Sequence, residues 1–115
     1  MKRTFEIDGK RMRVTSVSST DGIDAHTIFA FRQSGGTVWA SYAGGNIAQG
    51  FLIGTLDDGV LTFDYIQVTR DGRRDKGESR CELGLSPDGR LQLTERFQWS
   101  SRDGSGVNVL EETSD

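Results

Sequence analysis

The chain has 115 residues, a hydrophobic fraction of 34% and a formal net charge of −3 at pH 7. A chain of this length buries roughly two-thirds of its unfolded surface, so we expect a single domain over residues 1–115, and the composition excludes wholesale disorder. The acidic balance argues against a nucleic-acid binder, since neutralising phosphates requires a clustered basic surface.

Short glycine-containing clusters divide the chain at nearly even intervals, and glycine tolerates the positive φ angles of hairpin turns. The segments between the clusters are rich in β-branched and aromatic residues, which is typical of strands. In chain order we expect strands at 3–7, 11–18, 25–34, 37–43, 47–56, 60–70, 74–85, 90–100 and 107–112. The first of these is either a strand or a lead-in to the second.

This pattern predicts an all-β protein, an antiparallel up-and-down meander of about eight strands. Such a meander closes into a small barrel or forms a two-sheet sandwich, and its even spacing favours the calycin-like β-barrel. Closure also removes the exposed strand edges that invite aggregation. An eight-stranded barrel is either filled by side chains or wide enough for one small ligand.

Near the N-terminus the basic residues Lys2 and Arg3 are not followed by an apolar run, and no apolar segment is long enough to span a bilayer. We therefore expect a cytoplasmic protein without a membrane partner. Cys81 is the only cysteine, which agrees with a reducing compartment. Because it alternates with Leu83 and Leu85, we expect a small buried side chain rather than a catalytic thiol.

Two-residue alternation assigns an inward row to three predicted strands, although Trp39, on the opposite row of 37–43, is bulky enough to favour burial itself. The inward rows are Val38, Ala40 and Tyr42; Leu61, Phe63, Tyr65 and Gln67; and Leu91, Leu93, Glu95, Phe97 and Trp99. A few polar side-chain groups would then point into a space lined by aromatic and apolar side chains, as in a small-ligand site. The predicted ligand-binding residues are Tyr42, Tyr65, Gln67, Glu95, Phe97 and Trp99, with no cofactor and no metal.

Glu95 is the carboxylate in the middle of an otherwise apolar row. Burying a carboxylate costs several kcal/mol unless it is paired, hydrogen-bonded or protonated. Three explanations are open: a salt bridge to an inward arginine, either Arg32 or Arg80; a position near the barrel mouth that is open to water; or a functional carboxylate.

Other chemistry lacks a sequence signal. His26 is the only histidine, no Gly-x-Ser-x-Gly elbow accompanies it, and a surface or pocket-rim position is expected. The glycine-rich run at 44–54 lacks the features of a nucleotide loop and is interpreted as a hairpin turn with glycine kinks at a barrel bend. The basic window at 70–80 is interleaved with acidic residues, so we expect a solvated hairpin.

Two blocks, TIFAFRQSGGTVWASYAGGNIAQGFLIGTL at 27–56 and LTERFQWSSRDGSGVNVLEE at 93–112, resemble a family of short, mostly uncharacterised bacterial proteins. That family often carries an N-acetylglutamate synthase label. Acetyltransferases of the usual kind need an α/β fold and an Arg/Gln-x-x-Gly-x-Gly/Ala loop, whereas the nearest approach, 32–37, ends in threonine within a predicted hairpin. We therefore do not expect an acetyltransferase. At fold level the meander is similar to the calycin barrels, meaning lipocalins, fatty-acid-binding proteins and avidins.

Three functions remain open at this stage. The expected one is a small-molecule-binding barrel that holds an apolar or aromatic ligand in its interior. The alternatives are a barrel enzyme of the cyclase or isomerase type with Glu95 as general acid or base, and a structural protein with a filled barrel that oligomerises, for example as a homodimer.

Overall fold

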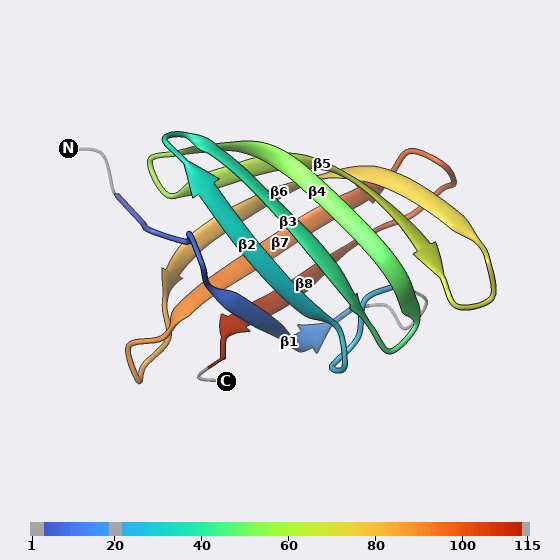
Figure 1. Ribbon diagram of the computed structural model, residues 1–115, viewed down its shortest axis with the longest axis horizontal. Coiled ribbons are helices and arrows are strands. Elements are labelled where there is room, and N and C mark those ends of the chain that lie inside the picture. Colours follow the sequence, from blue (N-terminus) through green and yellow to red (C-terminus); the bar gives the residue numbers. More distant parts are fainter. Residues whose placement is uncertain (1–3, 19–21, 114–115) are drawn as a thin grey trace.

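The computed structural model describes residues 4–18 and 22–113. Each strand pairs antiparallel with the next, and the last pairs with the first, so the sheet closes into a barrel (Figure 1). The strands are β1 (Arg11–Val17), β2 (Ile28–Ser34), β3 (Thr37–Gly44), β4 (Ile47–Asp57), β5 (Val60–Thr69), β6 (Arg74–Leu85), β7 (Leu91–Trp99) and β8 (Ser105–Glu112). The predicted all-β barrel is confirmed.

Of the two alternatives for the first predicted segment, the lead-in is confirmed, and the predicted start of the segment at 25–34 is wrong. Residues 4–7 form no strand and are a lead-in that ends with Ile7 fully buried, while residue 3 lies outside the described residues. β2 begins at Ile28 rather than at residue 25, because Asp24 and Thr27 form a hydrogen-bonded turn in which the Asp24 amide donates to Thr27 Oγ1. A local polar side chain that bonds the backbone competes with strand pairing in this way.

The up-and-down order places alternate connections at opposite ends of the barrel (Figure 1). The connections β2–β3, β4–β5 and β6–β7 define one end, here called the closed end, and the connections β1–β2, β3–β4, β5–β6 and β7–β8 define the other, the mouth end. Buried side chains fill the closed end: Ile7, Met12, Phe31, Val38, Leu61, Leu83, Leu91, Leu93 and Leu110. Among the described residues no helix is long and apolar enough to cross a membrane.

The strand faces follow the predicted alternation. In β3 the row of Val38, Ala40 and Tyr42 is buried, whereas Trp39 is 38% exposed, which settles the face that alternation left open. In β5 the row from Leu61 to Gln67 points inward. On these two strands the buried row and the exposed row are therefore the ones that two-residue alternation assigned.

Glycines on neighbouring strands make room for the inward rings. In the strand register, Gly50 lies opposite Tyr42, Gly77 opposite Tyr65 and Gly106 opposite Phe97. A Cβ atom at any of these glycines would overlap the facing aromatic side chain. The run at 44–54 therefore combines the predicted hairpin turn, where Gly44 and Gly45 have positive φ, with a close ring-to-backbone approach.

Candidate functional site

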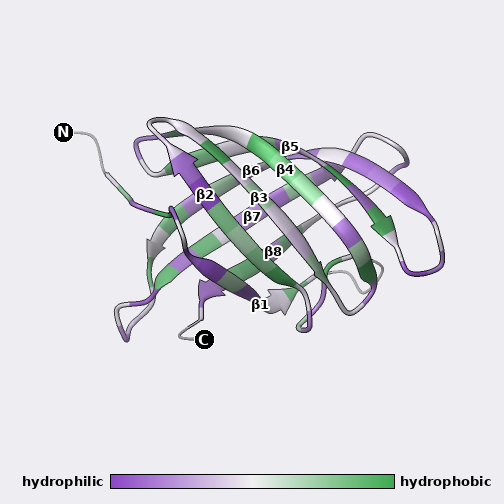
Figure 2. Ribbon diagram, in the orientation of Figure 1, coloured by the Kyte–Doolittle hydropathy of each residue, from purple (hydrophilic) through white to green (hydrophobic). Residues whose placement is uncertain are grey.

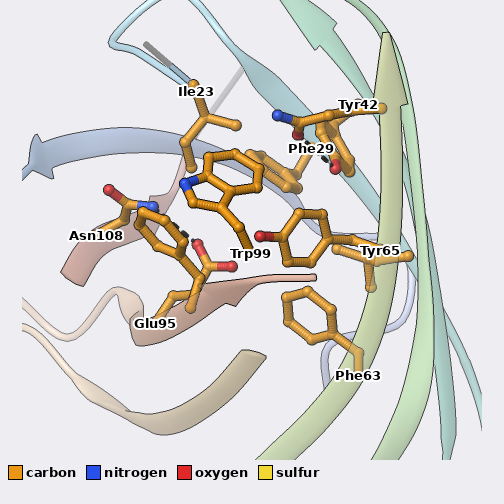
Figure 3. A pocket seen from close by; sticks show the side chains of 12 residues that line it. Ile23, Phe29, Tyr42, Phe63, Tyr65, Glu95, Trp99 and Asn108 are labelled. Atoms are coloured by element: carbon orange, nitrogen blue, oxygen red, sulfur yellow. Dashed lines mark hydrogen bonds between the residues drawn. The ribbon is translucent and has the colours of Figure 1, made fainter. Parts of the chain in front are cut away.

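The mouth end holds a cavity lined by residues from six strands and the β1–β2 connection (Figure 3). Its lining residues are Gly22, Ile23, Phe29, Tyr42, Leu52, Phe63, Tyr65, Gln67, Glu95, Phe97, Trp99 and Asn108. The structure brings together all six residues predicted from the sequence to bind a ligand, and their role in binding stays a prediction. Phe29, Ile23 and Asn108 were missed, although Asn108 shares the two-residue period of buried Leu110.

The cavity is narrow in this conformation. The space between the lining atoms is about 410 Å³, including the open mouth, but only about 30 Å³ of it admits the centre of a water-sized sphere. A space of this size has room for water molecules but not for a larger ligand. A larger ligand therefore requires the rings at the mouth to move.

The aromatic walls form two packed groups. Trp99 contacts Tyr65 and Phe97 edge to face, at centroid distances of 5.7 and 5.2 Å. Phe29 stacks on Tyr42 at 4.4 Å. Stacked and edge-to-face arrangements are favourable for aromatic rings, so these groups give the cavity packed apolar walls.

Glu95 is buried and is held by two neutral donors, of which Figure 3 shows Asn108. Ser79 Oγ donates to Glu95 Oε2 at 2.6 Å, and Asn108 Nδ2 donates to Oε1 at 3.1 Å. Burial raises the pKa of the Glu95 carboxyl, and these two hydrogen bonds offset the rise only in part.

Two of the three explanations offered for Glu95 are wrong. Arg32 lies on the outward row of β2 and pairs with Asp8 at 3.0 Å, and Arg80 lies on the outward row of β6, so neither reaches the interior. The carboxylate is also not open to water, since Glu95 is only 7% exposed. Successive side chains of a strand point to opposite faces of the sheet. Arg32 and Arg80 therefore point outward, between neighbours that point inward, and their charges stay in solvent.

The pH dependence of stability should report the burial of Glu95. Its folded-state pKa lies above the ordinary value of a glutamate carboxyl, so its contribution to stability is fully present below that ordinary value and is lost as the pH rises through the folded pKa. Each unit of difference corresponds to about 1.4 kcal/mol. The free energy of unfolding of the wild type relative to Glu95→Gln, from urea titrations between pH 4 and 8, should therefore fall with rising pH. A flat difference would show that the carboxyl is not buried as described.

Two polar atoms in the cavity are buried without a hydrogen-bond partner among the described residues: Tyr65 Oη and Gln67 Nε2. The Tyr42 hydroxyl donates to Gln67 Oε1 at 2.9 Å, which leaves the amide nitrogen of Gln67 with its donors unused. Burial raises the pKa of Tyr42 and of Tyr65, so both phenols remain protonated donors. An unsatisfied buried group costs about 1–3 kcal/mol, and a bound acceptor would remove that cost.

An ion cluster supports the mouth. The Asp75 side chain is 1% exposed; its carboxylate accepts hydrogen bonds from Arg73 Nε at 2.9 Å and from Arg102 Nε at 3.1 Å. The guanidinium of Arg102 lies 4.3 Å from the ring centre of Trp99. The expected solvated hairpin at 70–80 is therefore wrong for Asp75, which points inward and ties the β7–β8 connection to β6.

The other singled-out residues lie outside the cavity lining. His26 is exposed on the β1–β2 connection. Cys81 is fully buried opposite Glu95 in the register, as expected for a small core residue, and burial raises the pKa of its thiol. A thiol in this state is not a nucleophile.

The fold and cavity define a calycin-type barrel: eight antiparallel strands, one end packed and the other hollow and aromatic. Residues 5–113 match the sequence model of the family described as "Avidin-like protein", so the chain belongs to the avidin-like family. The match supports the expected likeness to calycin barrels and gives no support to the N-acetylglutamate synthase label. No curated protein and no solved structure matches the chain.

Proposed function

We propose that this protein binds one small apolar or aromatic molecule in the cavity at the mouth end. The observation that carries the proposal is the pair of unused donors, Tyr65 Oη and Gln67 Nε2, inside a cavity whose walls are mostly aromatic. A few polar groups in an apolar lining orient a ligand, and eight-stranded barrels hold a single small one. Membership of the avidin-like family is consistent with such a role.

The donors specify the polar part of the ligand. Both present hydrogens, so they fit an acceptor such as a carbonyl or ether oxygen. A carboxylate ligand fits less well, because its charge would be buried close to Glu95 and without a cation among the lining residues. The apolar part would lie against Phe63, Phe97 and Trp99, and the Trp99 ring would have to turn to admit it.

Native mass spectrometry of the freshly purified protein is the direct test. We expect an added mass that disappears on mild denaturation, or, after dialysis, a change in tryptophan fluorescence with one member of a panel of aromatic and apolar metabolites. The panel includes biotin, the ligand of streptavidin. A protein that carries no added mass and responds to no panel member would contradict the proposal.

The two cavity tyrosines offer a matched pair of variants. Tyr65→Phe removes an unsatisfied hydroxyl and should stabilise the ligand-free protein by about 1 kcal/mol, whereas Tyr42→Phe removes the donor to Gln67 Oε1 and should destabilise it by about 1 kcal/mol. Tyr65→Phe should nevertheless weaken ligand binding about tenfold. Urea unfolding and a binding titration check both signs, and a destabilised Tyr65→Phe would mean that its hydroxyl is already satisfied.

Ligand binding is better supported than a catalytic role for Glu95. Burial shifts the pKa of the carboxyl upward, which is the direction that a general acid or base at neutral pH requires. Both of its oxygens, however, already accept hydrogen bonds from Ser79 and Asn108, an arrangement that holds the group rather than presenting it to a reacting atom.

A further inference from the structure

The carboxylate of Glu95 is buried beside neutral groups. Figure 2 shows hydrophilic and hydrophobic residues following one another along β7, and Glu95 is the hydrophilic residue of its buried row. Its hydrogen-bond donors, Ser79 and Asn108, carry no charge. None of the described residues that line the cavity is an arginine, a lysine or a histidine, and no cation contributes to the shift of the Glu95 pKa. Because a buried carboxylate is unfavourable without a compensating positive charge, a cationic ligand would stabilise it.

The Glu95 carboxylate still has room to accept hydrogen bonds from a ligand. A carboxylate oxygen can accept two hydrogen bonds, and each oxygen of Glu95 accepts one from the protein. The residue lines the cavity (Figure 3), where burial and then the charge of Glu95 raise the pKa of Tyr65. Its two hydrogen bonds hold the carboxylate in place, so it is a fixed negative charge at the wall of the cavity.

Aromatic rings surround the same space. Trp99 contacts Tyr65 and Phe97, and Tyr65 contacts Phe63, all edge to face. The face of an aromatic ring attracts a cation that lies within about 6 Å of the ring centre. Trp99 already contacts one cation in this way, since the guanidinium of Arg102 lies 4.3 Å from its ring centre. A wall of rings beside a fixed carboxylate is therefore suited to a desolvated ammonium group.

We propose that the ligand of this cavity carries a protonated amine, which binds the carboxylate of Glu95 among the aromatic rings of the mouth end. This inference rests on the proposed function, because it specifies the ligand of the same cavity. The ammonium hydrogens would take the acceptor positions left on the carboxylate. An oxygen atom elsewhere in the ligand would accept from Tyr65 Oη and Gln67 Nε2. The ligand class is thus a small aromatic amine with an ether or carbonyl oxygen.

Three compounds with one common frame test the charge. Phenoxyethylamine, phenoxyethanol and phenoxyacetate share a ring and an ether oxygen, and their terminal groups are cationic, neutral and anionic at neutral pH. The cost of moving the rings at the mouth is common to all three. In calorimetric titrations of the full chain, we expect the amine to bind about tenfold more tightly than the alcohol, and the carboxylate to bind most weakly.

Two matched variants locate the negative charge. Glu95→Gln removes the charge and keeps the shape of the side chain, so the amine and the alcohol should then bind with affinities within about twofold of each other. Glu82→Gln is the control, because Glu82 is an exposed carboxylate on the outward row of β6 and should not affect the preference. Far-UV circular dichroism and the melting temperature check that both variants fold.

The possible results separate this inference from the proposed function. A wild type that binds phenoxyethanol, or a neutral metabolite of the panel, at least as tightly as the amine would overturn the inference and leave the proposed function standing. A preference for the amine that persists in Glu95→Gln, or that Glu82→Gln also abolishes, would overturn it as well, since Glu95 would not be the counter-charge. A protein that binds none of the three compounds and no panel member would contradict both.

Discussion

Gly77→Ala is expected to destabilise the barrel by about 3 kcal/mol, at the upper end of overpacking costs. An alanine Cβ at this position would overlap the backbone carbonyl oxygen of Gln98 and lie 2.5 Å from Tyr65 Oη. The carbonyl belongs to the strand ladder of β7 and cannot retreat without breaking pairing. The tyrosine hydroxyl would be displaced within the cavity, so ligand binding should be lost together with stability.

Gly84→Ala is the matched control on the same strand. No atom lies within 4 Å of a Cβ there, and its φ is not in the left-handed region, so the change should be within about 0.5 kcal/mol of neutral or slightly stabilising. Urea unfolding at one fixed chain concentration gives both values. If both substitutions changed the free energy of unfolding equally, Gly77 would not lie as close to the Gln98 carbonyl and to Tyr65 as described.

Asp75→Asn should cost about 3 kcal/mol, because it removes the buried charge that neutralises two arginines. The side chain is 1% exposed and accepts hydrogen bonds from Arg73 and Arg102. Because Arg102 also lies over Trp99, the substitution should loosen the β7–β8 connection at the mouth. The fluorescence of Trp99, measured in a Trp39→Phe background, should shift to longer wavelength as its ring becomes more exposed.

The control for this charge is Asp88→Asn. Asp88 pairs with Arg90, but both side chains are well exposed, so the loss should stay below about 1 kcal/mol. Unfolding in urea at pH 7 measures both changes. If Asp75→Asn lowered the free energy of unfolding as little as Asp88→Asn does, the ion cluster would not stabilise the mouth end. If Asp75→Asn destabilised the protein but left the Trp99 spectrum unchanged, the cluster would contribute to stability without positioning the Trp99 ring.

Much of the barrel could be predicted because its signals are local. Each glycine-containing turn and each two-residue alternation depends only on a few neighbouring residues in the sequence. These signals predicted the strands and the inward rows of β3, β5 and β7. These rows brought Tyr42, Tyr65, Gln67, Glu95, Phe97 and Trp99 into one prediction, and all six line the same cavity.

The partners of these residues could not be predicted. Ser79 and Asn108 meet Glu95 because β6 and β8 flank β7, at a register that depends on the lengths of the hairpins. The arginines suggested as partners lie on outward rows. Asp75 was assigned to a solvated hairpin because its neighbours in sequence are charged, whereas its ion pair with Arg102 joins β6 to the β7–β8 connection, 27 residues away in the chain.

The fold class, the strand order and the inward rows of three strands follow from the sequence alone, since they depend on turn chemistry and on a period of two. The contacts required the tertiary structure: among the described residues Glu95 is held by neutral donors, two donors in the cavity have no partner, and most of the exposed large hydrophobic residues lie on β3, β4 and β5. Those features depend on the stagger between strands, which places residues from distant parts of the chain side by side.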